Sequence, residues 1–302
     1  MTVSNYRVID ILKMSTDYLE KKGIDNPRLN VELLLGHVLK MKRVQLYLNF
    51  EKPLSPSELD QFRLFLKRRA NQEPIQYITG ETEFYSLKFK VNRYTLIPRP
   101  ETEILVDKII ETCTKTFSQL DKILVLDIGT GSGNIAISIA KNVQNAFISG
   151  IDINAEALKI ATHNAQVHNV QDQIQFRLAD VFDDNFFIKL TNKIDIVVSN
   201  PPYISQEEFD ALPIEVKHFE PYIALDGGKD GLIFYRRMLQ ISKEVLKANG
   251  IVGLEISYNK GDQISELAIN YGFRDVEVIN DLNGCERVII INKYNNLICA
   301  LL

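Results

Sequence analysis

The first seventy positions carry hydrophobic residues at the spacing of amphipathic helices. Between Val8 and Leu19 the apolar residues fall three or four positions apart, as they do on one face of a helix. An Asn-Pro pair at 26–27 is typical of a helix start, and Ser-Pro-Ser-Glu at 55–58 has the spacing of a capping box. We therefore expect a small, all-helical amino-terminal domain.

A short segment of alternating polarity follows this helical region. Leu87, Phe89 and Val91 alternate with two lysines, which is the pattern of a half-buried strand. We expect this strand to form part of a β-hairpin. The hairpin would belong to a connector over residues 74–96, which joins the helical domain to the rest of the chain.

From residue 123 onward, apolar runs of strand length alternate with helical patterns, and this alternation is typical of a mostly parallel sheet. The expected strands are 123–128, 146–152, 174–179, 194–199 and 250–256, followed by a closing pair at 273–279 and 287–292. A long helix is expected over 230–249. The fold class predicted for this part of the chain is therefore α/β.

The composition is that of an ordinary globular protein with a slight acidic excess. Of the 302 residues, 45% are hydrophobic and 25% are charged, and the formal net charge is −4. Because this balance gives no broad basic surface, we do not expect duplex nucleic acid as the main partner. The amino terminus does not resemble a signal peptide, and no apolar run, including the tail at 297–302, reaches membrane-spanning length.

The cysteines and histidines indicate neither a disulfide framework nor a metal site. Cys113, Cys285 and Cys299 are widely spaced and form no C-x-x-C pattern. Such usage favours a reducing compartment, so we expect the protein to be cytoplasmic. The four histidines show no metal-ligand spacing, and no bound metal is expected.

A glycine-rich turn joins the first strand of the sheet to the next helix. Residues 129–133 read Gly-Thr-Gly-Ser-Gly, which lets the backbone pass close to a ligand at a helix amino terminus. Asp152 ends the following strand about twenty residues on, where a carboxylate can accept hydrogen bonds from a ribose diol. The third strand ends at Asp180. The glycine spacing differs from the G-x-G-x-x-G fingerprint, so the pattern favours a nucleoside cofactor that need not be NAD.

The fourth strand ends in the tetrapeptide Asn200-Pro201-Pro202-Tyr203. Because two prolines cannot extend a sheet, Asn200 and Tyr203 lie on stiff backbone beyond the carboxyl end of a strand, where open α/β sheets bind ligands. The Asn200 side-chain carbonyl and the adjoining backbone carbonyl can accept hydrogen bonds from one planar –NH2 group, on which the Tyr203 ring can stack. The plainer alternative is a proline-rich turn that only ends a strand.

This order of motifs resembles the seven-stranded, Rossmann-like fold of the S-adenosylmethionine-dependent methyltransferases. In that fold, Asn-Pro-Pro-Tyr marks enzymes that methylate adenine N6 or the side-chain amide of glutamine. The segments at 74–80, 84–85, 96–103 and 220–232 further resemble the HemK/PrmC family of protein-(glutamine-N5) methyltransferases. The resemblance implies that S-adenosylmethionine is the cofactor, that the substrate is the glutamine of the Gly-Gly-Gln loop in class-1 peptide chain release factors, and that the enzyme supports translation termination.

The resemblance also implies which residues form the site. The implied cofactor contacts are Gly129, Thr130, Gly131, Ser132, Gly133, Asp152, Asp180, Val181, Phe182 and Asn200. The position after Asp180, often aromatic in the family, is Val181 here, so either Val181 or Phe182 could form the wall beside the adenine. The implied substrate contacts are Arg99, Glu101, Asn200, Pro201, Pro202 and Tyr203, with Asn200, Pro201 and Tyr203 as the catalytic group.

The expected organisation is a helical domain over residues 1–73, the connector over 74–96 and the methyltransferase domain over 97–302. A pocket that recognises one amide cannot choose among many glutamines, so we expect the helical domain to dock a folded surface of the release factor. We expect a monomer that binds neither DNA nor membrane.

Two alternative functions remain open at this point. One is an adenine-N6 nucleic-acid methyltransferase, which would share Asn-Pro-Pro-Tyr and the cofactor turn. Such an enzyme normally needs a basic, aromatic-rich recognition region, and this acidic chain without tryptophan has none. The other is a non-catalytic cofactor-binding module that docks on translation factors, since a fold alone does not establish activity.

Overall fold

The computed structural model describes residues 6–293, so the expectations for the extreme amino terminus, for Cys299 and for the tail at 297–302 lie outside the described residues. The chain divides into two compact units. One contains the residues up to Glu81 together with Pro213–Phe219, and the other contains Thr82–Leu212 together with the residues from Glu220 onward. The domain boundaries expected near residues 73 and 96 stay predictions. Within residues 6–293, no helix combines the length and the apolarity needed to cross a membrane.

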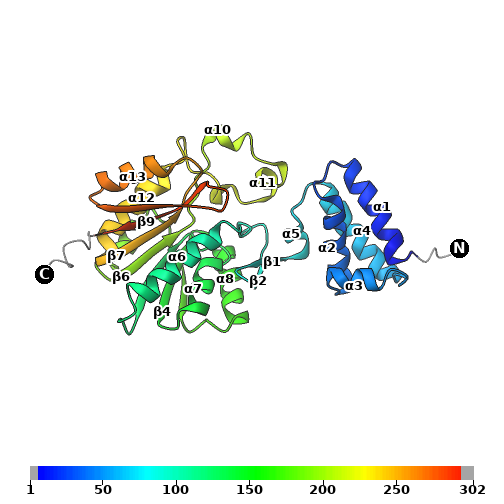
Figure 1. Ribbon diagram of the computed structural model, residues 1–302, viewed down its shortest axis with the longest axis horizontal. Helices are drawn as coiled ribbons and strands as arrows, with labels where there is room; N and C mark the ends of the chain where they lie inside the picture. Colours follow the sequence, from blue (N-terminus) through cyan, green and yellow to red (C-terminus); the bar gives the residue numbers. More distant parts are fainter. Residues whose placement is uncertain (1–5, 294–302) are drawn as a thin grey trace. The chain divides into compact units, whose positions relative to one another are not determined.

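The first unit is all-helical, as expected. Its helices are α1 (Val8–Lys21), α2 (Pro27–Leu39), α3 (Arg43–Leu48), α4 (Pro56–Ala70), α5 (Ile75–Thr79) and α11 (Ile214–Phe219). Leu12 of α1, Leu34 of α2 and Phe62 of α4 are almost completely buried in one apolar core. Figure 1 shows α1 to α4 packed against one another in blue and cyan.

The predicted starts of α4 and α2 are found at the expected positions, but only one is capped as expected. The Ser55 hydroxyl accepts a hydrogen bond from the Glu58 N–H, and the Glu58 carboxylate accepts one from the Ser55 N–H at 2.7 Å. The capping box is therefore confirmed. Asn26 precedes α2 with a left-handed φ of 50°, and its side chain makes no capping hydrogen bond.

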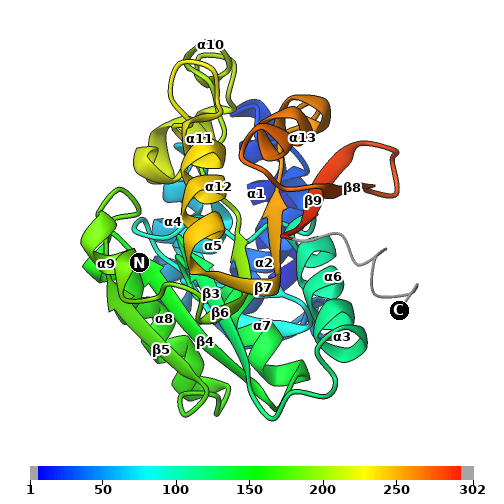
Figure 2. The same ribbon diagram turned by 90° about the vertical axis from the view of Figure 1, so that its left-hand side faces the viewer.

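The second unit contains a seven-stranded sheet, which confirms the predicted α/β, Rossmann-like fold class. The strands are β3 (Ile123–Ile128), β4 (Ala146–Asp152), β5 (Ile174–Leu178), β6 (Ile194–Ser199), β7 (Leu246–Glu255), β8 (Asp275–Asn280) and β9 (Glu286–Asn292). Their order is β5-β4-β3-β6-β7-β9-β8, and β9 runs in the opposite direction to the other six strands. Figure 2 shows β5, β4, β3 and β6 side by side.

Helices cover both faces of this sheet. The helices of this unit are α6 (Thr102–Lys115), α7 (Asn134–Asn142), α8 (Ala155–Val167), α9 (Asp184–Ile188), α10 (Gln206–Phe209), the 3₁₀ helix η1 (Tyr222–Ala224), α12 (Ile233–Val245) and α13 (Gly261–Asn270). Val125 and Ile196 pack into a core with α6 and α7, whereas Leu126 and Val197 pack into a second core with α12 and α13. In Figure 1 these two helix layers are green and yellow to orange. Because successive strand residues point to opposite faces, a strand buried on both faces reads as a continuous apolar run.

The predicted hairpin is also present, as the two-stranded sheet of β1 (Glu81–Phe84) and β2 (Leu87–Lys90). The expected helix over 230–249 is shorter, because α12 ends at Val245 and β7 begins at Leu246. Leu246 is completely buried and pairs with Ile194 of β6, while the Lys247 ammonium forms an ion pair with the buried Asp195 carboxylate at 2.8 Å. These contacts favour a strand over helix propensity at this point.

The order of the strands decides where a ligand can bind. In the sheet, β4 and β5 lie on one side of β3, whereas β6, which follows them in the sequence, lies on the other side. The carboxyl ends of β3 and β6 therefore flank the point where the sheet changes direction. Open α/β sheets bind ligands in the crevice at such a point.

Candidate active site

A cavity of about 470 Å³ lies at the carboxyl ends of the central parallel strands. This volume is in the usual range for small-molecule sites. The predicted site residues that line it are Arg99, Gly129, Thr130, Gly131, Ser132, Asp152, Asp180, Val181, Phe182, Asn200, Pro201 and Pro202. Gly133, Glu101 and Tyr203 are not among the lining residues. The structure thus brings residues from four strand ends and from the segment before α6 to one cavity.

The glycine turn after β3 combines an open backbone with close packing. Gly129 has a φ of 72°, and no atom lies within 4 Å of the position that a Cβ would occupy, so its backbone is accessible to a ligand. Gly133 has a φ of 80°, but a Cβ there would lie 3.2 Å from the side chains of both Ala161 and Phe176. Gly133 therefore lets the turn pack against α8 and β5 instead of lining the cavity.

Asp152, the last residue of β4, presents a fixed carboxylate to the cavity. The Gly131 N–H donates a hydrogen bond to one carboxylate oxygen at 2.9 Å, and the Asn154 N–H donates to the other at 2.8 Å. Burial raises the pKa of the Asp152 carboxyl above its ordinary value, although these backbone hydrogen bonds oppose the rise. Each oxygen keeps lone-pair capacity for a further donor, which suits a pair of ribose hydroxyls.

The wall of the cavity beyond β5 is aromatic. Val181 and Phe182 both line the cavity, and the Phe182 ring, which is 47% exposed, packs against Phe234 at a centroid distance of 5.6 Å. The buried Arg237 holds this segment in place, because its Nε donates to the Val181 carbonyl at 2.7 Å and its guanidinium pairs with Asp184. Phe234 of α12 also lines the cavity. No motif in the sequence around Phe234 indicated that it would.

This donor and acceptor set fits S-adenosylmethionine. The Asp152 carboxylate can accept hydrogen bonds from ribose hydroxyls, and the apolar wall at Val181 and Phe182 offers a surface for a flat base. The accessible backbone of the glycine turn, before the start of α7, can approach a charged amino-acid group. The predicted cofactor residues other than Gly133 therefore line one cavity with groups that suit this cofactor.

Asn200 is held at the junction of β6 and β3. The buried Ser199 hydroxyl, at the end of β6, donates a hydrogen bond to the Ile128 carbonyl at the end of β3, with an O···O distance of 2.6 Å. The Asn200 Nδ2 donates to the Thr102 hydroxyl at 3.3 Å. This contact occupies the amide NH2 group and leaves the side-chain oxygen as the acceptor that Asn200 can offer to the cavity.

Tyr203 lies beside the cavity without lining it. Its side chain is partly buried against the apolar core on the α12 side of the sheet. The backbone around it is clamped, because the Ile204 N–H donates to the Leu225 carbonyl at 2.9 Å and the Gly227 N–H donates to the Ile204 carbonyl at 2.8 Å. A Cβ at Gly227 would lie 2.7 Å from the Tyr203 Cα, so this approach requires glycine. The stacking role expected for Tyr203 stays a prediction.

Arg99 reaches the cavity from the segment before α6. Its guanidinium forms an ion pair with the Glu220 carboxylate, which is almost completely buried. The other Glu220 oxygen accepts a hydrogen bond from the Ile97 N–H at 3.2 Å. Glu220 therefore fixes the backbone and the side chain of this segment together. Sequence reasoning did not assign Glu220, because its partners lie more than a hundred residues away.

Two buried carboxyl groups lie next to the cavity residues. Burial raises the pKa of Asp127 to about 7, although its carboxylate accepts a hydrogen bond from the Thr130 hydroxyl at 2.6 Å. Burial also raises the pKa of Glu255 to about 7, and its carboxylate accepts a hydrogen bond from the Thr102 hydroxyl at 2.5 Å. In the described part of the chain, no three His, Cys, Asp or Glu side chains gather as a metal site.

Comparisons with known proteins agree with this geometry. Residues 10–80 match the family model of the PrmC N-terminal domain, and residues 119–271 match that of a methyltransferase domain. The hMettl16 catalytic domain, solved in complex with a MAT2A 3′UTR hairpin, is similar in structure with a TM-score of 0.55. At 13% identity over 82% of this chain and 86% of that chain, it shows a shared fold alone.

Three curated relatives are similar over nearly the whole chain. The chain is 37% identical to the release factor glutamine methyltransferase of Chlorobaculum tepidum, over 93% of this chain and 96% of that protein. It is also 37% identical to the enzyme of the same name from Rhodopirellula baltica, over 95% of this chain and 97% of that protein. A bifunctional methyltransferase of Rickettsia typhi is 39% identical over 96% of this chain, which spans only 58% of that longer protein. This chain therefore belongs to the family of release factor glutamine methyltransferases, and S-adenosylmethionine is its cofactor.

Proposed function

We propose that this protein transfers the methyl group of S-adenosylmethionine to the amide nitrogen, N5, of the glutamine in the Gly-Gly-Gln loop of class-1 peptide chain release factors. It acts in the cytoplasm as a monomer and supports translation termination. The observation that carries this proposal is that Asn200, Pro201 and Asp152 line one cavity, so an amide-binding corner adjoins a nucleoside-binding strand end. The names of the relatives that cover nearly the whole chain support the same substrate.

The proposed mechanism follows from the chemistry of a carboxamide. Its nitrogen is a poor nucleophile, because the lone pair is delocalised into the carbonyl group. The side-chain oxygen of Asn200 and the backbone carbonyl of Pro201 would accept the two N–H groups and hold the nitrogen in line with the reacting methyl carbon. Positioning of this kind can lower a barrier by up to about 7–11 kcal/mol.

The same two oxygens would also stabilise the reaction as it proceeds. The bound cofactor would supply a methyl group on a positively charged sulfur, and the new C–N bond would form as the S–C bond breaks. Positive charge then develops on the nitrogen, and the carbonyl dipoles of Asn200 and Pro201 interact with it more strongly than in the ground state. After transfer the extra proton passes from the nitrogen to water, because a protonated amide nitrogen is a strong acid, so no side chain is required as a general base.

The remaining predicted residues would shape the approach of the substrate. Arg99, fixed by the buried Glu220, lines the same cavity as Pro202. We assign Arg99, Glu101, Pro202 and Tyr203 to the channel through which the loop enters. Glycines beside the target glutamine fit such a channel, because a backbone without side chains is slim. The helical unit would dock a folded surface of the release factor and so select the protein to which that loop belongs.

One assay separates this function from the two alternatives. The purified chain is incubated with labelled S-adenosylmethionine and, separately, with whole release factor, with release factor whose loop glutamine is replaced by asparagine, and with DNA. We expect label only on the release factor that keeps its glutamine. Label on DNA would favour an adenine-N6 methyltransferase, and no label with retained cofactor binding would favour a non-catalytic module.

Asp152→Ala is expected to weaken the binding of S-adenosylmethionine. A charged acceptor that loses its hydroxyl partners costs about 1.5–3 kcal/mol, which corresponds to about 10- to 150-fold in the dissociation constant. Isothermal titration calorimetry measures the change directly. The matched control is Asp172→Ala, which removes an exposed carboxylate away from the cavity. Equal affinities of the two variants would mean that the Asp152 carboxylate does not contact the ribose.

A further inference from the structure

Three side chains from distant parts of the second unit form a continuous polar chain behind Asn200. Asn200 Nδ2 donates to the Thr102 hydroxyl at 3.3 Å, and the Thr102 hydroxyl donates to the Glu255 carboxylate at 2.5 Å. Thr102 begins α6 and Glu255 ends β7, and both are almost completely buried, with exposed fractions of 1% and 3%. Only Asn200 and Thr102 line the cavity, so the chain runs from the cavity into the protein interior.

The carboxylate at the inner end sets the direction of every hydrogen bond in this chain. An ionised carboxylate can only accept, so the single hydrogen of the Thr102 hydroxyl must go to Glu255. The Thr102 oxygen is then left as an acceptor and selects the NH2 group of Asn200. The side-chain oxygen of Asn200 must therefore point away from Thr102, which is the orientation needed to accept an N–H group from a substrate amide.

Protonation of Glu255 would remove this selection. A carboxylic acid can donate its own hydrogen to the Thr102 oxygen, and the Thr102 hydroxyl can then donate to the Asn200 side-chain oxygen. A half-turn of the amide about its last side-chain bond satisfies this arrangement. The amide NH2 group would then be presented to the substrate amide, and a donor facing a donor cannot bind it.

We propose that Thr102 and Glu255 are positioning residues, and that an ionised Glu255 holds the Asn200 amide in the one orientation that accepts the substrate –NH2 group. This inference rests on the proposed function, because it concerns how the substrate amide is held. Neither residue touches the reacting atoms. Both act through the direction of the hydrogen bonds that end at Asn200.

The surroundings of Glu255 place its titration in the range where an assay can follow it. Burial raises the pKa of Glu255 to about 7, and the negative charge of Glu101 adds to this rise. The hydrogen bonds from Thr102 and Asn200 and the positive charge of Arg287 oppose it. Tyr203 and Tyr235, which also face this carboxyl group, are neutral over the same range, because burial raises the pKa of each phenol above its ordinary value. Glu255 is therefore protonated below about pH 7 and ionised above it.

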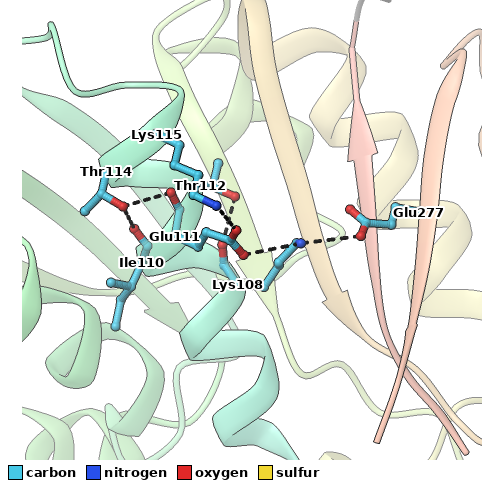
Figure 3. Close-up of polar contacts among 7 residues, drawn as sticks. All are labelled: Lys108, Ile110, Glu111, Thr112, Thr114, Lys115 and Glu277. Atoms are coloured by element: carbon cyan, nitrogen blue, oxygen red, sulfur yellow. Dashed lines mark hydrogen bonds and ion pairs between the residues drawn. The ribbon is translucent and has the colours of Figure 1, made fainter. Parts of the chain in front are cut away.

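The first test compares two threonines of the same helix. Thr102→Val removes the bridging hydroxyl between Glu255 and Asn200, leaves only their direct interaction, and keeps the shape of the side chain. Thr114→Val is the matched control, because the exposed Thr114 hydroxyl bonds only the helix carbonyls of Ile110 and Glu111 (Figure 3). We expect Thr102→Val to lower kcat on release factor by about tenfold and Thr114→Val to leave it unchanged. Thr102→Ser, which restores the hydroxyl, should recover most of the loss.

The second test is the pH dependence of kcat. In the wild-type protein, kcat should rise with pH through a midpoint near the pKa of Glu255, because only the ionised carboxyl fixes the amide. Glu255→Gln keeps the shape and removes the titration, so its kcat should be lower and independent of pH between about 6 and 8.5. Cofactor affinity and the thermal unfolding temperature are measured in parallel and should stay close to those of the wild-type protein.

The outcomes separate this inference from the proposed function. If the wild-type protein does not methylate release factor, the proposed function is wrong and the comparison of variants does not arise. If it does, and Glu255→Gln keeps both the wild-type kcat and the same rise with pH, the inference is overturned and the rise belongs to another group, such as Asp127. Equal kcat values for Thr102→Val and Thr114→Val would overturn it as well.

Discussion

Replacing Asn200 by alanine is expected to lower methyl transfer to whole release factor by about 10²–10³-fold, the usual effect of removing one pre-organised hydrogen-bonding group from a reaction centre. The physical reason is that the substrate nitrogen loses one of its two acceptors and is no longer held in line with the methyl group. The affinity for S-adenosylmethionine should change by less than about threefold, because Asp152 and the glycine turn carry cofactor binding. Single-turnover kinetics and calorimetry measure the two effects separately.

The control for this prediction is Asn142→Ala, at the carboxyl end of α7. Asn142 is exposed at the end of α7, and its amide donates to the Ser138 carbonyl at 2.8 Å. Asn142→Ala therefore removes the same amide group as Asn200→Ala, but at a position away from the cavity. This control should transfer methyl groups at the wild-type rate. Near-normal turnover by Asn200→Ala on the intact protein substrate would show that Asn200 does not hold the nucleophile.

Removing the residues up to position 71 is expected to lower kcat/KM on whole release factor by about 10- to 100-fold. This loss corresponds to the removal of one or two strong docking contacts. Activity on a short Gly-Gly-Gln peptide, weak in the full chain, should stay similar, because a peptide has no folded surface for the helical unit to hold. Initial rates on the two substrates, measured with the same enzyme preparation, give the comparison.

A variant with two surface substitutions tests the same prediction in the full-length chain, where no residues are removed and the fold is kept. Val44 and Leu48 lie one turn apart on α3 and are 63% and 80% exposed. Replacing both by aspartate should raise the KM for whole release factor, whereas Leu282→Asp, at a fully exposed leucine of the other unit, should not. Equal losses on protein and peptide for the shortened chain would mean that the helical unit supports the catalytic fold and selects nothing.

The parts of the fold that sequence reasoning predicted correctly are those with strong local patterns. The central strands β3 and β6 are nearly continuous apolar runs because both faces of the sheet are covered there, and the capping box at Ser55 is complete within four residues. The helices α3, α5, α9, α10, α11 and α13 were not predicted. All but α13 have six residues or fewer, which is too short for a helical period to show. The ten-residue α13 was missed although it is long enough for such a period.

The candidate site was predictable to the extent that its residues sit at strand ends. The glycine turn, Asp152 and Asn200 each follow an apolar run, so the topology of a parallel sheet brings them to one edge. Thr102, Glu220 and Phe234 could not be assigned in this way. Each is placed by contacts with residues far away in the chain, as in the 98-residue separation between Thr102 and Asn200. Nothing in the sequence near Thr102 indicates which side chain it will meet.

The helical unit is not a contiguous block of sequence. Its last helix, α11, is contributed by Pro213–Phe219, and Glu215 of that segment pairs with the buried Arg69 guanidinium at 2.9 Å. The chain thus passes between the two units at three points, after Glu81, before Pro213 and after Phe219. A chimaera in which only the first eighty codons were exchanged with those of a relative would combine the helices of one protein with α11 of the other. Recombination between relatives can therefore transplant the complete helical unit only if both sequence segments are exchanged together.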